Sequence, residues 1–320
     1  MLTPEQCESY QRNGYLLVPD LFSKEQLAPA LEVAEQNAYG KSHEEFNAEI
    51  DAHPEIAETL IRPKGRRSFG GPRAEFHDIP TGIDAIDRTL EHEPFLDALT
   101  QLLDTPDMHY HHGFVYARSG RLDRGTPKEP WQGFHIDWAK PLLPPHPEWQ
   151  RYGHIQAWVY LTDNDADCAP VRVLPGAHSK MNKLIRDPLG TEHASYRFDD
   201  IRKLPYKFEP VTATGKTGTV LFYSSHTPHS AQAFTNPRKQ RAVLFYAVGR
   251  RDTSTWTLTE KRDIQERGRL RPFLTKTTAR ARSLFGWPNP GDDFYTPETL
   301  NLIKNAYPEM DLSPYKESRL

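Results

Sequence analysis

The stretch Trp131-Gln132-Gly133-Phe134-His135-Ile136-Asp137-Trp138 places a histidine and an aspartate two residues apart inside an aromatic frame. On a β-strand, residues two apart point to the same face, so His135 and Asp137 would leave the strand side by side. Two neutral imidazoles and one carboxylate on one face of an octahedron form the ligand set of non-haem Fe(II) oxygenases. The stretch therefore supplies two of three such ligands, and the third would be a distal histidine.

A His-x-Asp pair alone decides little. The chain has 14 histidines, and about one such pair is expected by chance. His135-Ile136-Asp137 is the only one present. The alternative interpretation is a solvated pair at an exposed strand end, and the downstream sequence must decide between the two.

Composition narrows the class of protein. The chain has 320 residues, a formal net charge of −3 and a pI near 6.5, which give no overall attraction to nucleic acid or anionic membrane. No apolar run reaches membrane-spanning length, and the opening residues lack the features of a signal peptide. Cys7 and Cys168 are too few for a thiolate zinc site, and we expect buried, reduced thiols. We expect a cytoplasmic monomer or homodimer that acts on a small molecule, with no nucleic acid and no membrane partner.

The N-terminal sequence predicts a helix, a strand and a second helix. Thr3-Pro4-Glu5-Gln6 is typical of a helix start, and the helix should end near Gly14. Residues 15–18 form a short strand, and Ser23 caps the next helix. This order resembles the opening of the phytanoyl-CoA dioxygenase family, in which the same three elements precede the catalytic barrel.

Three further segments are predicted to surround the core. Residues 40–75 are polar and weakly periodic, so we expect a solvated loop, with a lid over an anionic substrate as the alternative for its basic run 62–67. Residues 91–103 should form a helix with a buried apolar stripe. Residues 251–320 carry no recognisable motif, and a C-terminal helical cover is expected.

Alternating apolar residues predict strands at 110–120, 152–161 and 218–223. His111 and His112 are adjacent and point to opposite faces, which makes them poor joint metal ligands. The segment from Val171 to Lys180 resembles the family's strand followed by a Pro-Gly-Ser-His turn, with Ala177 in the serine position. His178 corresponds to a structural turn residue in that family.

Two histidines compete to be the distal ligand. In the phytanoyl-CoA dioxygenase family this histidine follows the glycine that opens the preceding strand by eleven residues, and counting from Gly218 gives His229. His226 falls three residues short, just before a turn at Thr227-Pro228 that would redirect the chain. The resemblance therefore selects His229.

Arg241 opens an apolar strand, where an arginine without a partner is rare, so a fixed anion should meet it. Its position matches the family's arginine for the distal carboxylate of 2-oxoglutarate, and a bidentate guanidinium suits that group. Gln132 is expected to hydrogen-bond the same co-substrate. Substrate contacts are predicted for Arg118, Trp138, Lys140 and Trp158, with core packing as the alternative for the two tryptophans.

The resemblance implies a mainly β protein with flanking helices and a double-stranded β-helix core, which is a jelly-roll, cupin-like fold. We expect one domain over residues 1–320, with N-terminal helices in 1–105, the core in 106–250 and the cover in 251–320. The expected cofactors are Fe(II), held by His135, Asp137 and His229, together with 2-oxoglutarate and O2, and ascorbate as an optional stimulant. The expected reaction is oxidation of a small organic molecule with release of succinate and CO2.

Asp137 bears on the reaction, because related halogenases have Gly or Ala there and bind chloride instead. Hydroxylation, desaturation or ring formation is therefore expected. Two alternatives remain: a non-catalytic jelly-roll protein that binds a ligand, and a cupin-type isomerase or hydrolase that uses another metal. The C-terminal Ser318-Arg319-Leu320 is one conservative change from a peroxisomal signal, which makes the peroxisomal matrix the alternative location in a eukaryote.

Overall fold

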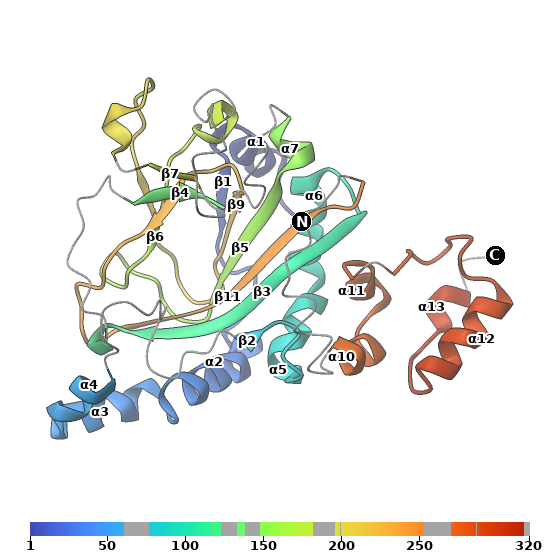
Figure 1. The fold of residues 1–320 in the computed structure, drawn as a ribbon, viewed down its shortest axis with the longest axis horizontal. Coiled ribbons are helices and arrows are strands. Elements are labelled where there is room, and N and C mark those ends of the chain that lie inside the picture. Colours follow the sequence, from blue (N-terminus) through green and yellow to red (C-terminus); the bar gives the residue numbers. More distant parts are fainter. Residues whose placement is uncertain are drawn as a thin grey trace.

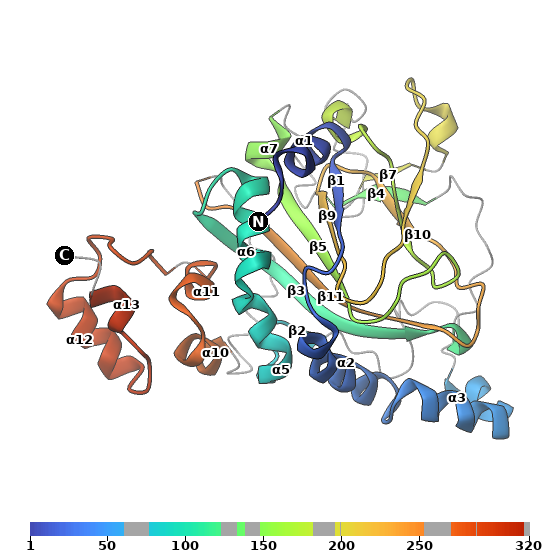
Figure 2. The ribbon, with the colours of Figure 1, turned by 180° about the vertical axis from the view of Figure 1, so that it is seen from behind.

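The protein combines two antiparallel β-sheets with helices (Figure 1). Helices α2 and α6 contact strands of the larger sheet, and a group of C-terminal helices lies beyond one end of it (Figure 2). No helix among the described residues is long and apolar enough to cross a bilayer. The computed structural model describes residues 1–60, 77–122, 133–137, 148–181, 196–198, 200–252, 270–285 and 287–316.

The N-terminal elements form as predicted. Helix α1 (Pro4–Asn13) begins with a reciprocal capping box between Thr3 and Gln6. It ends at Gly14, whose φ of 75° is a left-handed conformation that glycine adopts without strain. Strand β1 (Tyr15–Val18) follows, and Ser23 caps α2 (Lys24–Tyr39) with a second capping box. Local capping chemistry alone therefore sets these boundaries.

In the part of the chain that the structure describes, the larger sheet has six strands in the order β1-β9-β5-β11-β3-β2. Each neighbouring pair is antiparallel, and β3 and β11 pair over almost their full lengths. These strands confirm the predicted strand positions. Their bounds are β2 (His77–Asp78), β3 (Met108–Ser119), β5 (His154–Tyr160), β9 (Val220–Ser224) and β11 (Gln240–Arg250).

Among the described residues, the smaller sheet has five strands in the order β7-β4-β10-β6-β8. The chain alternates between the sheets from β3 to β6 and again from β8 to β11. Segments far apart in sequence therefore become neighbours, and β10 pairs with β4 although more than 90 residues separate them. The bounds are β4 (Phe134–Ile136), β6 (Val171–Val173), β7 (Tyr196–Phe198), β8 (Val211–Ala213) and β10 (His229–Ala231).

The larger sheet buries both of its faces. On β11, Val243 packs with Val173 of the smaller sheet, whereas Leu244 belongs to the cluster that includes Phe95 of α6. Because side chains alternate along a strand, Arg241 lies on the same face as Val243. The start of β11 therefore directs a cation between the two sheets.

Residues 40–60 contradict the predicted solvated loop. They form α3 (His43–Ala52) and α4 (Pro54–Leu60), with α3 capped by Ser42 and Glu45. Phe46 and Ile50, four residues apart, are only 2% and 3% exposed. A narrow buried stripe and a capping box outweigh the polar composition. The basic run 62–67 lies outside the described residues.

Further helices flank the sheets. Helix α6 (Glu93–Leu103) has the predicted buried stripe of Phe95, Leu96, Leu99 and Leu102. Short helices α5 (Asp84–Asp87) and α7 (Trp149–Tyr152) precede α6 and β5. Short 3₁₀ turns cover Arg88–Glu91, Gly120–Leu122, His178–Lys180 and Ile201–Lys203.

The described part of the C-terminal region is helical, as expected. The Tyr110 N–H donates to the Leu284 carbonyl at 2.7 Å, and Arg280 forms an ion pair with Asp97 of α6 at 2.7 Å. Farther along the chain, Tyr295 and Tyr315 centre a separate small apolar cluster. The helices are α10 (Leu270–Lys276), α11 (Ala279–Ser283), α12 (Pro297–Ala306) and α13 (Ser313–Lys316).

Candidate metal centre

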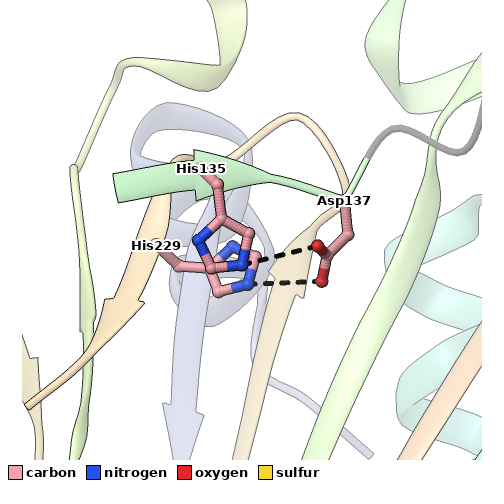
Figure 3. Close-up of side chains that lie close together, drawn as sticks. All are labelled: His135, Asp137 and His229. Atoms are coloured by element: carbon pink, nitrogen blue, oxygen red, sulfur yellow. Dashed lines mark ion pairs between the residues drawn. The ribbon is translucent and has the colours of Figure 1, made fainter. Parts of the chain in front are cut away.

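Three side chains predicted as metal ligands converge at the paired strands β4 and β10. His135 lies within β4, Asp137 follows its last residue, and His229 opens β10 directly opposite His135. The Asp137 carboxylate lies 3.5 Å from His135 Nε2 and 3.3 Å from His229 Nε2 (Figure 3). One ligand atom from each residue lies within 4.8 Å of the others, close enough to hold one metal ion.

The backbone orients both imidazoles for coordination. His229 Nδ1 lies 3.2 Å from the Thr227 carbonyl, and His135 Nδ1 lies 3.3 Å from the Gly133 carbonyl. A carbonyl oxygen only accepts, so each Nδ1 carries a hydrogen, which leaves Nε2 as the atom that can coordinate a metal. Both Nε2 atoms face the carboxylate, which is the arrangement that a shared divalent metal requires.

The Asp137 carboxylate is ionised at neutral pH. Desolvation raises its pKa, but the charge that His229 carries when protonated and the hydrogen bond that it then donates, the charge of protonated His135 and a hydrogen bond from Gln156 outweigh desolvation and hold the pKa well below its usual range. Gln156 Nε2 donates to Asp137 Oδ2 at 3.1 Å. One carboxylate and two imidazole Nε2 atoms match the donor set that favours Fe(II) with open positions.

The competing histidines lie elsewhere. His226 is fully buried, with its Nδ1 3.3 Å from Ser225 Oγ, and it is not part of the cluster. His178 is also buried and bonds the Gln11 carbonyl through Nε2 at 3.0 Å. The turn before β10 thus brings His229, and not His226, beside His135 and Asp137.

Arg241 is 3% exposed and lies among aromatic residues between the sheets. Its guanidinium donates to the Ala169 carbonyl and, at 2.5 Å, to the Tyr116 hydroxyl. Its Cζ lies 5.7 Å from the centre of the Trp158 ring, and its Nε has no hydrogen-bond partner. No acidic side chain among the described residues pairs with this buried cation. An anionic ligand would supply the missing counter-charge.

A second group of possible ligands has a simpler explanation. Asp165, Asp167 and Cys168 lie within coordinating distance of one another. Lys239 Nζ lies 2.7 Å from an Asp165 oxygen and 2.9 Å from an Asp167 oxygen. Both carboxylates therefore already have the Lys239 ammonium group as an ion-pair partner. The acidic turn therefore functions as a salt-bridged loop.

The sequence matches the phytanoyl-CoA dioxygenase (PhyH) family over residues 10–242. The chain belongs to this family. As a member, it is a non-haem Fe(II)- and 2-oxoglutarate-dependent dioxygenase, which confirms the predicted enzyme class and cofactors.

Two curated relatives resemble this family member over most of their length. The ectoine dioxygenase of Stutzerimonas stutzeri (strain A1501) is 23% identical over 278 residues, covering 79% of this chain and 78% of the relative. The ectoine dioxygenase of Bordetella bronchiseptica is 23% identical over 252 residues, covering 74% and 72%.

Solved structures share the fold at lower identity. The structure of EctD from S. alaskensis with bound Fe has a TM-score of 0.51 and 19% identity, covering 78% of this chain and 77% of that one. The carbocyclase SnoK from nogalamycin biosynthesis has a TM-score of 0.50 and 16% identity, covering 83% and 90%. These similarities show a shared fold.

The structure locates only some of the other predicted site residues. Trp158 lies beside Arg241, and Arg118 is paired directly opposite Arg241 on β3. Gln132, Trp138 and Lys140 lie outside the described residues.

Sequence reasoning missed three side chains near the centre. Tyr223 packs its ring 4.7 Å from the His229 ring and accepts a hydrogen bond from Trp158 Nε1 at 2.9 Å. Tyr116 meets Arg241, and Gln156 holds Asp137. The available signal was strand alternation, because a polar or amphipathic residue recurs on the face that β3, β5 and β9 turn toward the smaller sheet.

Proposed function

We propose that this dioxygenase holds Fe(II) through His135, Asp137 and His229 and oxidises a small organic substrate, most simply by hydroxylation. The observation that carries the proposal is the convergence of two imidazole Nε2 atoms on one carboxylate. We further propose that the two sheets form one double-stranded β-helix domain, since the chain alternates between them strand by strand.

The anion expected at Arg241 is the distal carboxylate of 2-oxoglutarate. The unpartnered Nε and a remaining Nη hydrogen offer the side-by-side donors that a carboxylate accepts. Arg118, directly opposite on β3, adds a second guanidinium, and two cations facing each other across a strand pair favour a bound anion. Gln132 remains a predicted partner of the same co-substrate.

Each of the chain's groups then has one task. When bound, iron and 2-oxoglutarate supply the oxidising chemistry, in which O2 is reduced, 2-oxoglutarate becomes succinate and CO2, and the substrate is oxidised. His135 and His229 keep their Nε2 atoms directed at the site through the contacts of their Nδ1 atoms with backbone carbonyls. Tyr223 and Trp158 pack beside His229 and Arg241, where they exclude water.

The substrate is proposed only as a class. Asp137 keeps the carboxylate that halogenases of related type lack, so oxygen insertion or another carbon oxidation is favoured. The relatives are named for ectoine oxidation and for carbocycle formation, at 23% and 16% identity. Both names describe small organic molecules. Contacts from Arg118, Trp138, Lys140 and Trp158 remain predictions.

The test uses the full chain with Fe(II), 2-oxoglutarate, ascorbate and O2, and measures succinate with and without candidate substrates. The wild-type chain should bind one metal ion and release succinate, whereas Asp137→Ala should do neither, because the only anionic ligand of the three is lost. Asp163→Ala is a suitable control, since that carboxylate bonds Lys216 outside the site. Equal metal binding and turnover in wild type and Asp137→Ala would refute the proposal.

A further inference from the structure

Gln156 on β5 is a buried amide that touches a proposed metal ligand. Its side chain is 1% exposed, and its Nε2 lies 3.1 Å from Asp137 Oδ2. The cross-strand neighbours of Gln156 are Tyr223, which packs on His229, and Ala247, whose small side chain crowds it little. Gln156 therefore lies beside the centre without belonging to its ligand set.

The chemistry of the contact fixes the orientation of the amide. An ionised carboxylate can only accept hydrogen bonds, so the NH2 group must face Asp137 and the carbonyl Oε1 must point away. Oε1 is buried and has no hydrogen-bond partner. The amide thus satisfies Asp137 while leaving its own acceptor without a donor.

That imbalance argues against a purely structural role. Burying an amide without its hydrogen bonds costs about 1 to 3 kcal/mol. The side chain of a leucine would avoid that cost, and the site lies in an otherwise aromatic and apolar layer. Among the described residues, the one side-chain hydrogen bond of Gln156 is to Asp137, so the residue is best explained by what it does to that carboxylate.

We propose that Gln156 is a positioning residue that fixes the rotation of the Asp137 carboxylate and so sets which oxygen faces the metal. This inference rests on the proposed metal centre. Asp137 follows the last residue of β4, and its side chain is 39% exposed, so its own strand constrains it less than β10 constrains His229. A donor from the opposite sheet holds Oδ2 and leaves the other oxygen for coordination. Such partners of metal ligands commonly contribute about 10- to 100-fold in metal affinity.

The test compares three full-length proteins under anaerobic titration with Co(II), followed by visible absorption that reports the coordination of the ion. Gln156→Leu removes the donor and the unsatisfied acceptor together, so the metal-free protein should stay folded. Asn164→Leu is the matched control, because Asn164 is also a 1% exposed amide with an unpartnered oxygen, near the end of the same strand. If Gln156→Leu folds poorly, Gln156→Asn keeps an amide that is one methylene too short to reach Asp137.

Gln156→Leu should weaken Co(II) binding about 10- to 100-fold and change the absorption spectrum at saturation, because the freed carboxylate adopts another geometry. Asn164→Leu should leave both unchanged. Unchanged affinity in Gln156→Leu, or weaker binding with an unaltered spectrum at saturation, would overturn the positioning role. A wild-type chain that binds no Co(II) would instead refute the proposed metal centre, so the two failures are distinguishable.

Discussion

Replacing Arg241 with leucine tests the co-substrate site most directly. The substitution removes the buried guanidinium and the donors that we assign to the distal carboxylate of 2-oxoglutarate. It also removes the hydrogen bonds to the Ala169 carbonyl and the Tyr116 hydroxyl. We therefore expect a large loss of affinity for 2-oxoglutarate and a small change in the free energy of unfolding.

The magnitude follows from the number of charge-assisted bonds. Each hydrogen bond to a charged group contributes about 1.5 to 3 kcal/mol, so two such bonds contribute about 3 to 6 kcal/mol. This range corresponds to about 10²- to 10⁴-fold weaker binding of 2-oxoglutarate. Arg241→Lys keeps the charge without the planar pair of donors and should fall between the two proteins. For the free protein, removal of a buried cation offsets the loss of its two hydrogen bonds to neutral acceptors, so the free energy of unfolding should change little.

Calorimetric titration of 2-oxoglutarate into the Mn(II)-loaded protein, without oxygen, measures this affinity. Arg282→Leu is the matched control, because Arg282 is 2% exposed and donates to backbone carbonyls in the C-terminal region. The control should keep its affinity for 2-oxoglutarate. If Arg241→Leu binds 2-oxoglutarate as tightly as the wild type, the assignment of this arginine is wrong.

Two other predictions concern histidines. His229→Ala should abolish metal binding, whereas His226→Ala should still bind one metal ion per chain and lose only stability. Analysis of the metal content of both variants after dialysis measures this difference. If His226→Ala loses the metal and His229→Ala keeps it, the two residues have the opposite roles. Burial lowers the pKa of His178 to about 4, and burial together with the Arg121 charge does the same for His43. An unfolded histidine titrates near pH 6.5, so below that pH the unfolded chain binds more protons than the folded chain. As the pH falls from about 6.5 to about 4, the free energy of unfolding should therefore decrease by up to about 3 kcal/mol per residue. Urea unfolding across this range checks the slope, and His178→Gln should reduce it; a flat profile would contradict the buried, neutral state of both side chains.

Much of the site could be predicted from the sequence because its determinants are local. His135 and Asp137 share a strand and its immediate end, and the distance from Gly218 to His229 is set by one strand and one turn. The helix boundaries at Thr3 and Ser23 likewise depend on capping bonds within a few residues. Features that depend on residues so close in the sequence can be predicted without a structure.

Side-chain contacts between different strands and sheets could not be predicted from the sequence. The alternation in residues 152–161 predicts the strand that contains Gln156, but the contact of Gln156 with Asp137 depends on the separation of two sheets that no sequence pattern gives. The same holds for Tyr116, whose partner Arg241 lies on the neighbouring strand. Helix α3 was missed for a different reason, because only two of its buried residues, Phe46 and Ile50, are apolar and its polar composition resembled a loop.

The N-terminal segment that carries the family resemblance also contributes to the metal centre. The Thr227 hydroxyl donates to the Gly14 carbonyl at 2.7 Å, and the Thr227 carbonyl is the group that orients His229. A side chain at Gly14 would meet His178 Nδ1 at 2.3 Å and the Thr227 hydroxyl at 2.7 Å, so the contact requires glycine. His178, in turn, bonds the Gln11 carbonyl at the end of α1. These contacts join three segments into one packed unit: helix α1, the turn that contains His178, and His229. This packing gives a physical reason why one chain carries all three segments, although they lie far apart in the sequence.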